Sequence, residues 1–290
     1  MEAYLLIKFE SGVGDTYSTL VSAYEASLEL ERFGYNTTLV LETRRNVYFS
    51  PEIKLDVLYD LSGFKNVVYN IATDATGNPD IAGVYNVRRI PQNQLSYHIY
   101  VDTVIPQLQN YQSHIFGHPE LKHNTRRPTC NTQLLSAKVI EIAKTMLPDP
   151  SRVVGLQYRA YDMQGDIEHL LNPIKDTIDK YAEVYKDRTV LVSSNGNFLR
   201  NYMKTRHSNV LSPTFSNTTI PFYPCYVRYR QDLTEDDFVL HAQEIAAEMS
   251  LYRYCEKIIS FSPFLSNFIT YGIINNQYTT NYFELILESI

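Results

Sequence analysis

The stretch that decides the fold is YLLIKFESGVGDTYSTLVSAYEASLELERFGYNTTLVLE, residues 4–42. Residues 4–9 form an apolar run typical of a buried strand, and a turn follows it. Residues 16–32 carry apolar side chains at helical spacing, and Gly34 stands where such a helix would end. Residues 36–42 are rich in β-branched and apolar residues, which predicts a second strand. The stretch therefore predicts a β-α-β unit of a parallel sheet.

The pattern is less regular up to residue 148 and then restarts. Short strands are expected at 56–59, 66–71 and 96–104, a basic loop at 114–128, and an amphipathic helix at 134–146. Pro148-Asp149-Pro150 is typical of a linker. Beyond it, strands are expected at 152–158, 189–193, 209–211 and 257–261, with helices at 167–185, 197–205, 240–254 and 264–271.

Two α/β units follow from this pattern. We expect an N-terminal Rossmann-like domain at 1–148, a C-terminal one at 149–275, and a C-terminal segment at 276–290 that could pack back on the first domain. Ligands of such sheets bind beyond the carboxyl ends of the strands, so a cleft between the domains is the expected site.

Composition narrows the class of protein. The chain has 290 residues, 44% of them hydrophobic, and a formal net charge of -6, which excludes a broadly basic nucleic-acid coat. Three widely spaced cysteines, Cys130, Cys225 and Cys255, give neither a disulfide framework nor a zinc site. They indicate a reducing compartment, so a cytoplasmic location is expected. No segment has the pattern of a leader peptide, and no apolar run reaches about 18 residues, so neither targeting nor a membrane span is expected.

The turn Gly12-Val13-Gly14-Asp15 joins the first strand to the first helix. Two glycines let a ligand approach the backbone, and a helix N-terminus attracts anions. A dinucleotide fingerprint needs a third glycine where Tyr17 stands, which weighs against an NAD-dependent oxidoreductase. The alternative is an ordinary tight turn with Asp15 as the helix cap.

Arg159 and Asp162 follow the strand that opens the second unit. Arginine makes planar, two-pronged contacts with phosphate and stays charged, and an aspartate can hold its fork in place. The alternative is a surface ion pair at the end of a strand.

Two further polar turns follow strands of the second unit. Ser193, Ser194 and Asn195, with Gly196 after them, suit a loop around a base or ribose, or an ordinary capped turn. Ser262 and Ser266 lie in a serine-rich turn, whose hydroxyl and N–H groups can bind phosphate oxygens. Ser262 is also expected to cap the next helix, with Pro263 at its first position.

Taken in order, these segments resemble the donor-binding half of the GT-B fucosyltransferase group. That group includes bacterial α-1,6- and α-1,2-fucosyltransferases and protein O-fucosyltransferases. It carries a strand ending in His-x-Arg-x-x-Asp, for which this chain has Gln157-Tyr158-Arg159-Ala160-Tyr161-Asp162. It then has a Ser/Thr-Asp loop, an acidic residue on a helix, and a serine-rich turn. The resemblance covers residues 1–42 and 152–271, and it departs at Gln157 and at Ser194-Asn195, which replace the histidine and the acidic pair.

The resemblance implies two Rossmann-like α/β domains facing across a cleft and a glycosyltransferase activity. A sugar would move from a nucleotide-diphosphate sugar, with a GDP-sugar favoured, to a hydroxyl acceptor, with inversion and with neither metal nor cofactor. Arg159 would neutralise the leaving diphosphate, and Asp162 would orient the Arg159 guanidinium. The donor would also meet the residues Gly12, Gly14, Gln157, Ser193, Ser194, Asn195, Glu248, Ser262 and Ser266.

The general base and the acceptor are less well indicated. Asp15 is the carboxylate nearest the expected cleft, with His114 and His118 as alternatives. The basic clusters Arg88-Arg89 and residues 122–127 could hold an anionic acceptor, a glycan or even a modified DNA base, although a solvated face is the simpler reading. A non-catalytic nucleotide-sugar or glycan-binding protein on the same scaffold is the alternative function.

Overall fold

A computed structural model describes residues 2–8, 13–32, 34–43, 54–70, 84–89, 99–101, 134–158, 175–194, 197–216, 234–260 and 284–287. The chain divides into two compact units, residues 1–137 and 138–290. The sequence placed this boundary after residue 148 instead. Within the described residues, no helix has the length and apolar character needed to cross a membrane.

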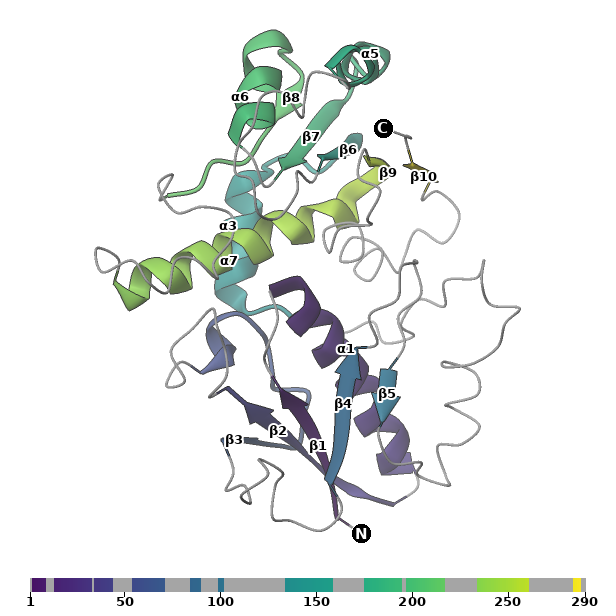
Figure 1. Ribbon diagram of the computed structural model, residues 1–290, viewed down its shortest axis with the longest axis vertical. Helices are drawn as coiled ribbons and strands as arrows, with labels where there is room; N and C mark the ends of the chain where they lie inside the picture. Colours follow the sequence, from purple (N-terminus) through teal and green to yellow (C-terminus); the bar gives the residue numbers. More distant parts are fainter. Residues whose placement is uncertain are drawn as a thin grey trace. The chain divides into compact units, whose positions relative to one another are not determined.

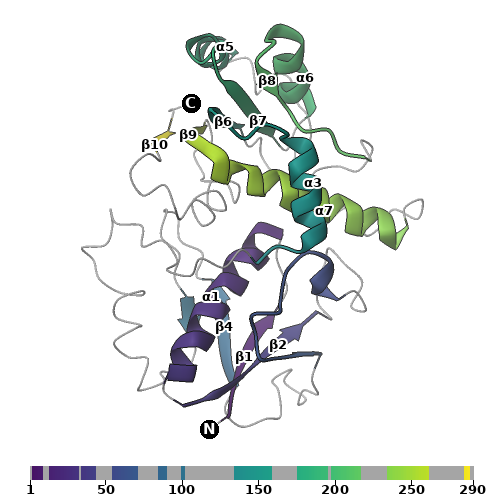
Figure 2. The ribbon, with the colours of Figure 1, turned by 180° about the vertical axis from the view of Figure 1, so that it is seen from behind.

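The first unit holds a five-stranded sheet in the order β3-β2-β1-β4-β5 (Figure 1). Its strands are β1 (Glu2–Lys8), β2 (Asn36–Glu42), β3 (Asn66–Tyr69), β4 (Val84–Arg89) and β5 (Ile99–Val101). Strands β1 to β4 are mutually parallel, and β5 runs antiparallel to β4. Helix α1 (Val13–Arg32) links β1 to β2, and Figure 2 shows it in front of the sheet. The predicted β-α-β unit is confirmed.

Gly34 ends α1 for a backbone reason. Its φ is 81°, a left-handed conformation that side chains disfavour. Its N–H donates to the Glu31 carbonyl at 3.0 Å, and the Tyr35 N–H donates to the Leu30 carbonyl at 3.1 Å. This pair of bonds is the Schellman arrangement, which satisfies the last carbonyls of the helix and turns the chain into β2.

The strand predicted at 56–59 is wrong. Residues Leu55–Val57 form a single 3₁₀ turn, η1. Leu55, Leu58 and Tyr59 are all buried, and their spacing of three and four residues is that of a helical turn. The Tyr59 hydroxyl donates to the Val13 carbonyl at 2.9 Å, so this turn anchors the start of α1.

The second unit holds a parallel five-stranded sheet in the order β10-β9-β6-β7-β8. Its strands are β6 (Val153–Tyr158), β7 (Thr189–Ser194), β8 (Val210–Leu211), β9 (Cys255–Ser260) and β10 (Glu284–Leu287). Its helices are α3 (Ala137–Met146), α5 (Lys175–Val184), α6 (Asn197–Arg206) and α7 (Glu235–Leu251), with a 3₁₀ turn η6 (Tyr252–Tyr254) after α7. Part of segment 276–290 thus joins this sheet as β10.

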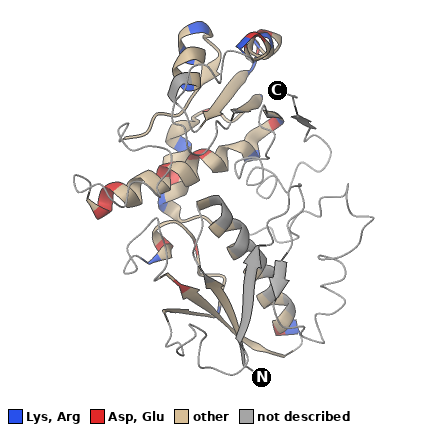
Figure 3. Cartoon of the chain, viewed as in Figure 1, with Lys and Arg blue, Asp and Glu red and all other residues tan. Residues whose placement is uncertain are grey.

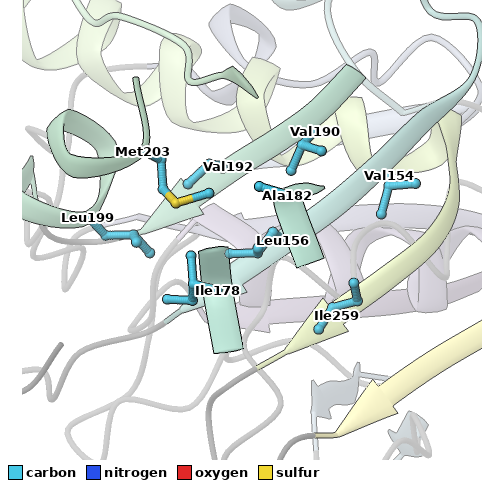
Figure 4. Close-up of a cluster of buried hydrophobic side chains, with 9 residues drawn as sticks. All are labelled: Val154, Leu156, Ile178, Ala182, Val190, Val192, Leu199, Met203 and Ile259. Carbon is cyan, nitrogen blue, oxygen red and sulfur yellow. The ribbon is translucent and has the colours of Figure 1, made fainter. Parts of the chain in front are cut away.

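Two helices cover one face of the second sheet (Figure 4). Apolar side chains of α5 and α6 meet those of the central strands, and all of them are almost completely buried. The cluster comprises Val154, Leu156, Ile178, Ala182, Val190, Val192, Leu199, Met203 and Ile259. Because side chains alternate along a strand, Gly155, Gln157 and Ser193 point to the opposite face, where α7 lies.

Helices α5 and α6 are also joined at their polar edges. Asp179 accepts hydrogen bonds from the Tyr202 hydroxyl at 2.7 Å and lies 2.7 Å from Nε2 of His207. Burial alone would raise the pKa of Asp179, but bonds from His207 and Tyr202 and the nearby charge of Arg206 outweigh it and lower that pKa. Tyr202 also packs against the apolar cluster, so these polar contacts are continuous with the core between α5 and α6.

Helix α7 starts earlier than the sequence reading of 240–254 placed it. The Thr234 hydroxyl accepts from the Asp237 N–H at 3.2 Å, while the Asp237 carboxylate accepts from the Thr234 N–H at 2.9 Å. This reciprocal cap precedes a first turn that contains Glu235, Asp236 and Asp237, seen in red in Figure 3. Negative charge at a helix N-terminus interacts favourably with the helix dipole and so stabilises the helix.

We expect replacement of Gly155 with alanine to destabilise the second unit by about 1–3 kcal/mol, the usual cost of overpacking a core. A Cβ at this position would lie 2.8 Å from Cε1 of Tyr252 and 3.0 Å from Sγ of Cys255. Both neighbours are almost completely buried, so neither can move aside cheaply. Urea denaturation followed by circular dichroism measures the loss.

The matched control is Gly63→Ala in the first unit. The added Cβ there would meet only the end of the Tyr24 ring, at 2.6 Å from Cε2, and that ring is half-buried and can turn. Both changes restrict the unfolded chain equally. Equal losses for the two variants would contradict close packing at Gly155.

Candidate functional site

The two sheets share one topology, which gives each unit one switch point. The candidate site is the one in the second unit, because most of the predicted donor residues follow its strands. Counted along each unit, both sheets have the strand order 3-2-1-4-5 in one direction. The order reverses between the first and fourth strands of a unit, which are β6 and β9 here. Ligands of such sheets bind at this switch point, outside the carboxyl ends of the strands.

The predicted site residues follow the ends of these strands in the sequence. Arg159 comes directly after Tyr158, the last residue of β6, and Ser262 comes shortly after Ser260, the last residue of β9. Gln157 pairs in register with Ser260 on one side and with Ser193 on the other. Six predicted residues lie outside the described part of the chain: Gly12, Arg159, Asp162, Asn195, Ser262 and Ser266. The same holds for the alternative bases His114 and His118 and for the basic residues 122–127.

The structure brings together three of the predicted residues. The Ser193 hydroxyl donates to Oε1 of Glu248 at 2.8 Å, and this bond links β7 to α7. Ser194 ends β7 next to it, and all three residues are almost completely buried, with Glu248 0% exposed. Gln157, at the position where the fucosyltransferase motif has histidine, is also buried, at 1% exposure.

Arg200 of α6 completes this group, and the sequence reading did not include it. Its guanidinium lies 2.7 Å from Oε1 of Glu248 through Nη1, and its Nη2 donates to Oε2 at 2.9 Å. The same guanidinium donates to the Ser194 carbonyl from Nε at 2.9 Å and from Nη2 at 2.8 Å. A buried carboxylate is thus matched by a buried cation at the carboxyl end of β7.

Tyr252, in the 3₁₀ turn η6 after α7, is the last member of this group. Its ring packs beside Gly155, and its hydroxyl donates to the Leu156 carbonyl at 3.5 Å. Burial raises the pKa of the Tyr252 phenol well above 10, and an interaction with the Ser193 hydroxyl offsets only part of that rise. Tyr252 therefore stays neutral and supports the site through packing and hydrogen bonds.

A second carboxylate of α7 lies one helical turn before Glu248. Oε1 of Glu244 accepts from the N–H of Ser216 at 2.8 Å and from its hydroxyl at 2.5 Å. Oε2 of Glu244 and the hydroxyl of Ser212 are buried, and neither has a hydrogen-bond partner in the part of the chain that the structure describes. Buried polar groups are normally paired, so these two atoms, one on α7 and one just after β8, can accept from a further donor.

The first unit holds the remaining predicted residues. Gly14 and Asp15 lie inside the first turn of α1, because the helix begins at Val13. The alternative reading of Asp15 as a helix cap is therefore wrong. Arg88 and Arg89 end β4, the strand beside β1 at the switch point of this sheet.

No group of three or more histidine, cysteine, aspartate or glutamate side chains among the described residues could hold a metal ion.

Comparison with solved structures identifies the architecture. The fucosyltransferase NodZ from Bradyrhizobium matches with a TM-score of 0.52 and 15% sequence identity, over 94% of this chain and 91% of that one. A second structure of NodZ matches with a TM-score of 0.50 and 14% identity, over 94% and 93% of the two chains. No family model and no curated protein sequence matches this chain.

The matched enzyme belongs to the group that the sequence motifs resemble, so the predicted α/β fold of the GT-B type is confirmed. At this level of identity the likeness concerns the fold, because one fold hosts many functions.

Two charged residues of the site were not predicted from the sequence. Arg200 and Glu244 lie on helices, where charged residues usually face solvent, and no spacing in the sequence links Arg200 to Glu248. Glu244 and Glu248 are four residues apart and separated only by apolar residues, and this spacing was the one available signal that both carboxylates share a buried face.

Proposed function

We propose that the protein is a glycosyltransferase that moves a sugar from a nucleotide-diphosphate sugar, with a GDP-sugar favoured, to a hydroxyl acceptor. The observation that carries the proposal is the topology of the second unit. The switch point of its sheet lies between β6 and β9. Arg159 directly follows β6, and Ser262 follows β9 with one residue between. The match to a fucosyltransferase fold supports it.

In this proposal Arg159 contacts the diphosphate of the donor. Negative charge grows on the diphosphate oxygens as the bond to the sugar breaks, so a fixed cation stabilises the transition state more than the ground state. Asp162 holds the guanidinium in place, and the hydroxyl and N–H groups at Ser262 and Ser266 donate to the same oxygens. Ser193, Ser194, Asn195 and Glu248 form the nucleoside side of the site. Gln157 replaces a histidine and can donate or accept a hydrogen bond without titrating.

The acceptor side is proposed to lie on the first unit. Gly12 and Gly14 let the acceptor approach the backbone at the start of α1, and Asp15 is the proposed general base. The transfer is proposed to invert the sugar and to need no metal, since the sequence lacks an Asp-x-Asp motif after a strand.

A binding screen tests the donor. GDP is expected to raise the unfolding temperature more than UDP or CMP at equal concentration. A ligand at 100 times its dissociation constant adds about 2.7 kcal/mol of stability. A rise with NADH and none with GDP or UDP would favour the oxidoreductase reading instead. No shift with any nucleotide would contradict the proposal.

A non-catalytic nucleotide-sugar binding protein is the second candidate, and the buried Gln157 in place of the motif's histidine favours it. The two candidates differ in turnover. The transferase slowly releases labelled sugar from its donor even without an acceptor, because water can replace the hydroxyl. The binding protein shows the same thermal shift with GDP and releases no sugar.

A further inference from the structure

Arg200 uses its whole hydrogen-bonding capacity inside the second unit. The guanidinium carries five N–H groups. Two of them donate to the Ser194 carbonyl, and one, from Nη1, donates to the Pro213 carbonyl at 3.3 Å. The remaining two face Oε1 and Oε2 of Glu248. The side chain is about 95% buried, and its cation also lies 5.2 Å from the centre of the Phe215 ring.

These bonds join three segments that are distant in the sequence. Ser194 is the last residue of β7, Pro213 follows the end of β8, and Glu248 lies on α7. The end of the segment after β8 is held separately, since Glu244 of α7 binds both polar groups of Ser216. The carboxyl ends of two neighbouring strands are therefore attached to one helix.

Stability alone does not explain a buried ion pair at this place. Replacing such a pair with well-packed apolar residues is often neutral or even stabilising, because both ions lose their hydration. What apolar residues cannot supply is direction: five N–H groups in one plane hold their acceptors at fixed angles. Binding sites need such fixed geometry in the groups that line them.

We infer that Arg200 is a positioning residue for nucleotide binding, acting through Ser194 and Glu248 without touching the nucleotide itself. The inference rests on the proposed function, because it assigns the nucleoside to the loop that follows Ser194. In this view the ion pair keeps the end of β7 and the segment after β8 in the conformation that fits the donor.

The test compares Arg200→Lys with Met203→Ala by titration calorimetry with GDP. Lysine keeps a cation beside Glu248 but loses the planar fork that holds the Ser194 and Pro213 carbonyls. Met203 lies on the same helix, is 0% exposed and packs in the apolar cluster of Figure 4. Its replacement therefore lowers stability without removing any hydrogen bond of Arg200. We expect the dissociation constant for GDP to rise about ten- to a hundredfold in Arg200→Lys and to stay unchanged in folded Met203→Ala.

Kinetics gives a readout that a purely structural role would not move. Loss of ground-state positioning raises KM for the donor while kcat changes little, whereas loss of a group that acts in the transition state lowers kcat. We expect the first pattern for Arg200→Lys in a donor-hydrolysis assay. If Arg200→Lys does not fold, Arg200→Gln replaces it, since the neutral amide keeps a planar donor beside Glu248 and loses the five-donor fork.

The outcomes separate the two proposals. Binding of GDP to the variant as tight as to the wild-type protein would overturn the positioning role and leave the proposed function intact. Equal weakening in Met203→Ala would also overturn it, because general loss of stability would then explain the effect. Absence of nucleotide binding in the wild-type protein would overturn the proposed function and this inference together.

Discussion

Replacing Arg159 with alanine is expected to reduce turnover of the sugar donor by about 10²–10³-fold, the usual cost of removing one group that stabilises developing negative charge. The fold should be unaffected, because Arg159 comes after the last residue of β6 and the apolar cluster of Figure 4 is formed by other residues. Arg159→Lys should retain part of the activity, since it keeps the charge and loses the two-pronged contact. The release of labelled sugar from the donor is the measurement, with circular dichroism as the check on folding.

Arg152→Ala is the matched control for this prediction. Arg152 lies just before the other end of β6, with a side chain that is 56% exposed and paired with Asp187 on the surface. The two changes remove the same side chain from opposite ends of one strand. Full turnover in Arg159→Ala would refute the site assignment, and so would an equal loss in Arg152→Ala.

Breaking the buried ion pair from one side should have the largest effect on stability. Arg200→Met alone is expected to lower the free energy of unfolding by about 3–5 kcal/mol, because Glu248 would keep a buried carboxylate without its cation. The double variant Arg200→Met with Glu248→Leu should regain most of this loss, since an apolar pair needs no hydration. Urea denaturation of the three proteins measures both effects.

A surface pair again provides the comparison. Arg152→Met removes the exposed partner of Asp187 and should change stability by less than about 1 kcal/mol. If Arg200→Met cost no more than that, the burial of the Arg200–Glu248 pair would not matter for the folded state. If the double variant stayed as unstable as the single one, the contacts of Arg200 with the backbone carbonyls would carry the stability instead.

Strands and helices with strong local patterns were predicted correctly. The first β-α-β unit, strand β7 and helix α6 lie where apolar spacing placed them. Ser193 and Glu248, which the sequence assigned to one site, are joined by a hydrogen bond, and their role there stays a prediction.

The missed elements are those whose form depends on a neighbour. Strand β4 reads VYNVRR, a polar segment that drew attention as a basic cluster, yet it pairs in register with β1. The four residues of β10 form a strand because β9 offers them an unpaired edge. Such pairing satisfies backbone groups and leaves almost no trace in side-chain periodicity.

The sequence by itself determined the local structure and the order of polar turns after the strands, because apolar periodicity and glycine positions act over a few residues. Only the tertiary structure decided that Arg200 of α6 meets Glu248 of α7, 48 residues further on, and the carbonyls of Ser194 and Pro213. Nothing local distinguishes a buried arginine from an exposed one on a helix. Arg200 becomes buried because folding places the Glu248 carboxylate beside it, and a buried negative charge needs a cation as its partner.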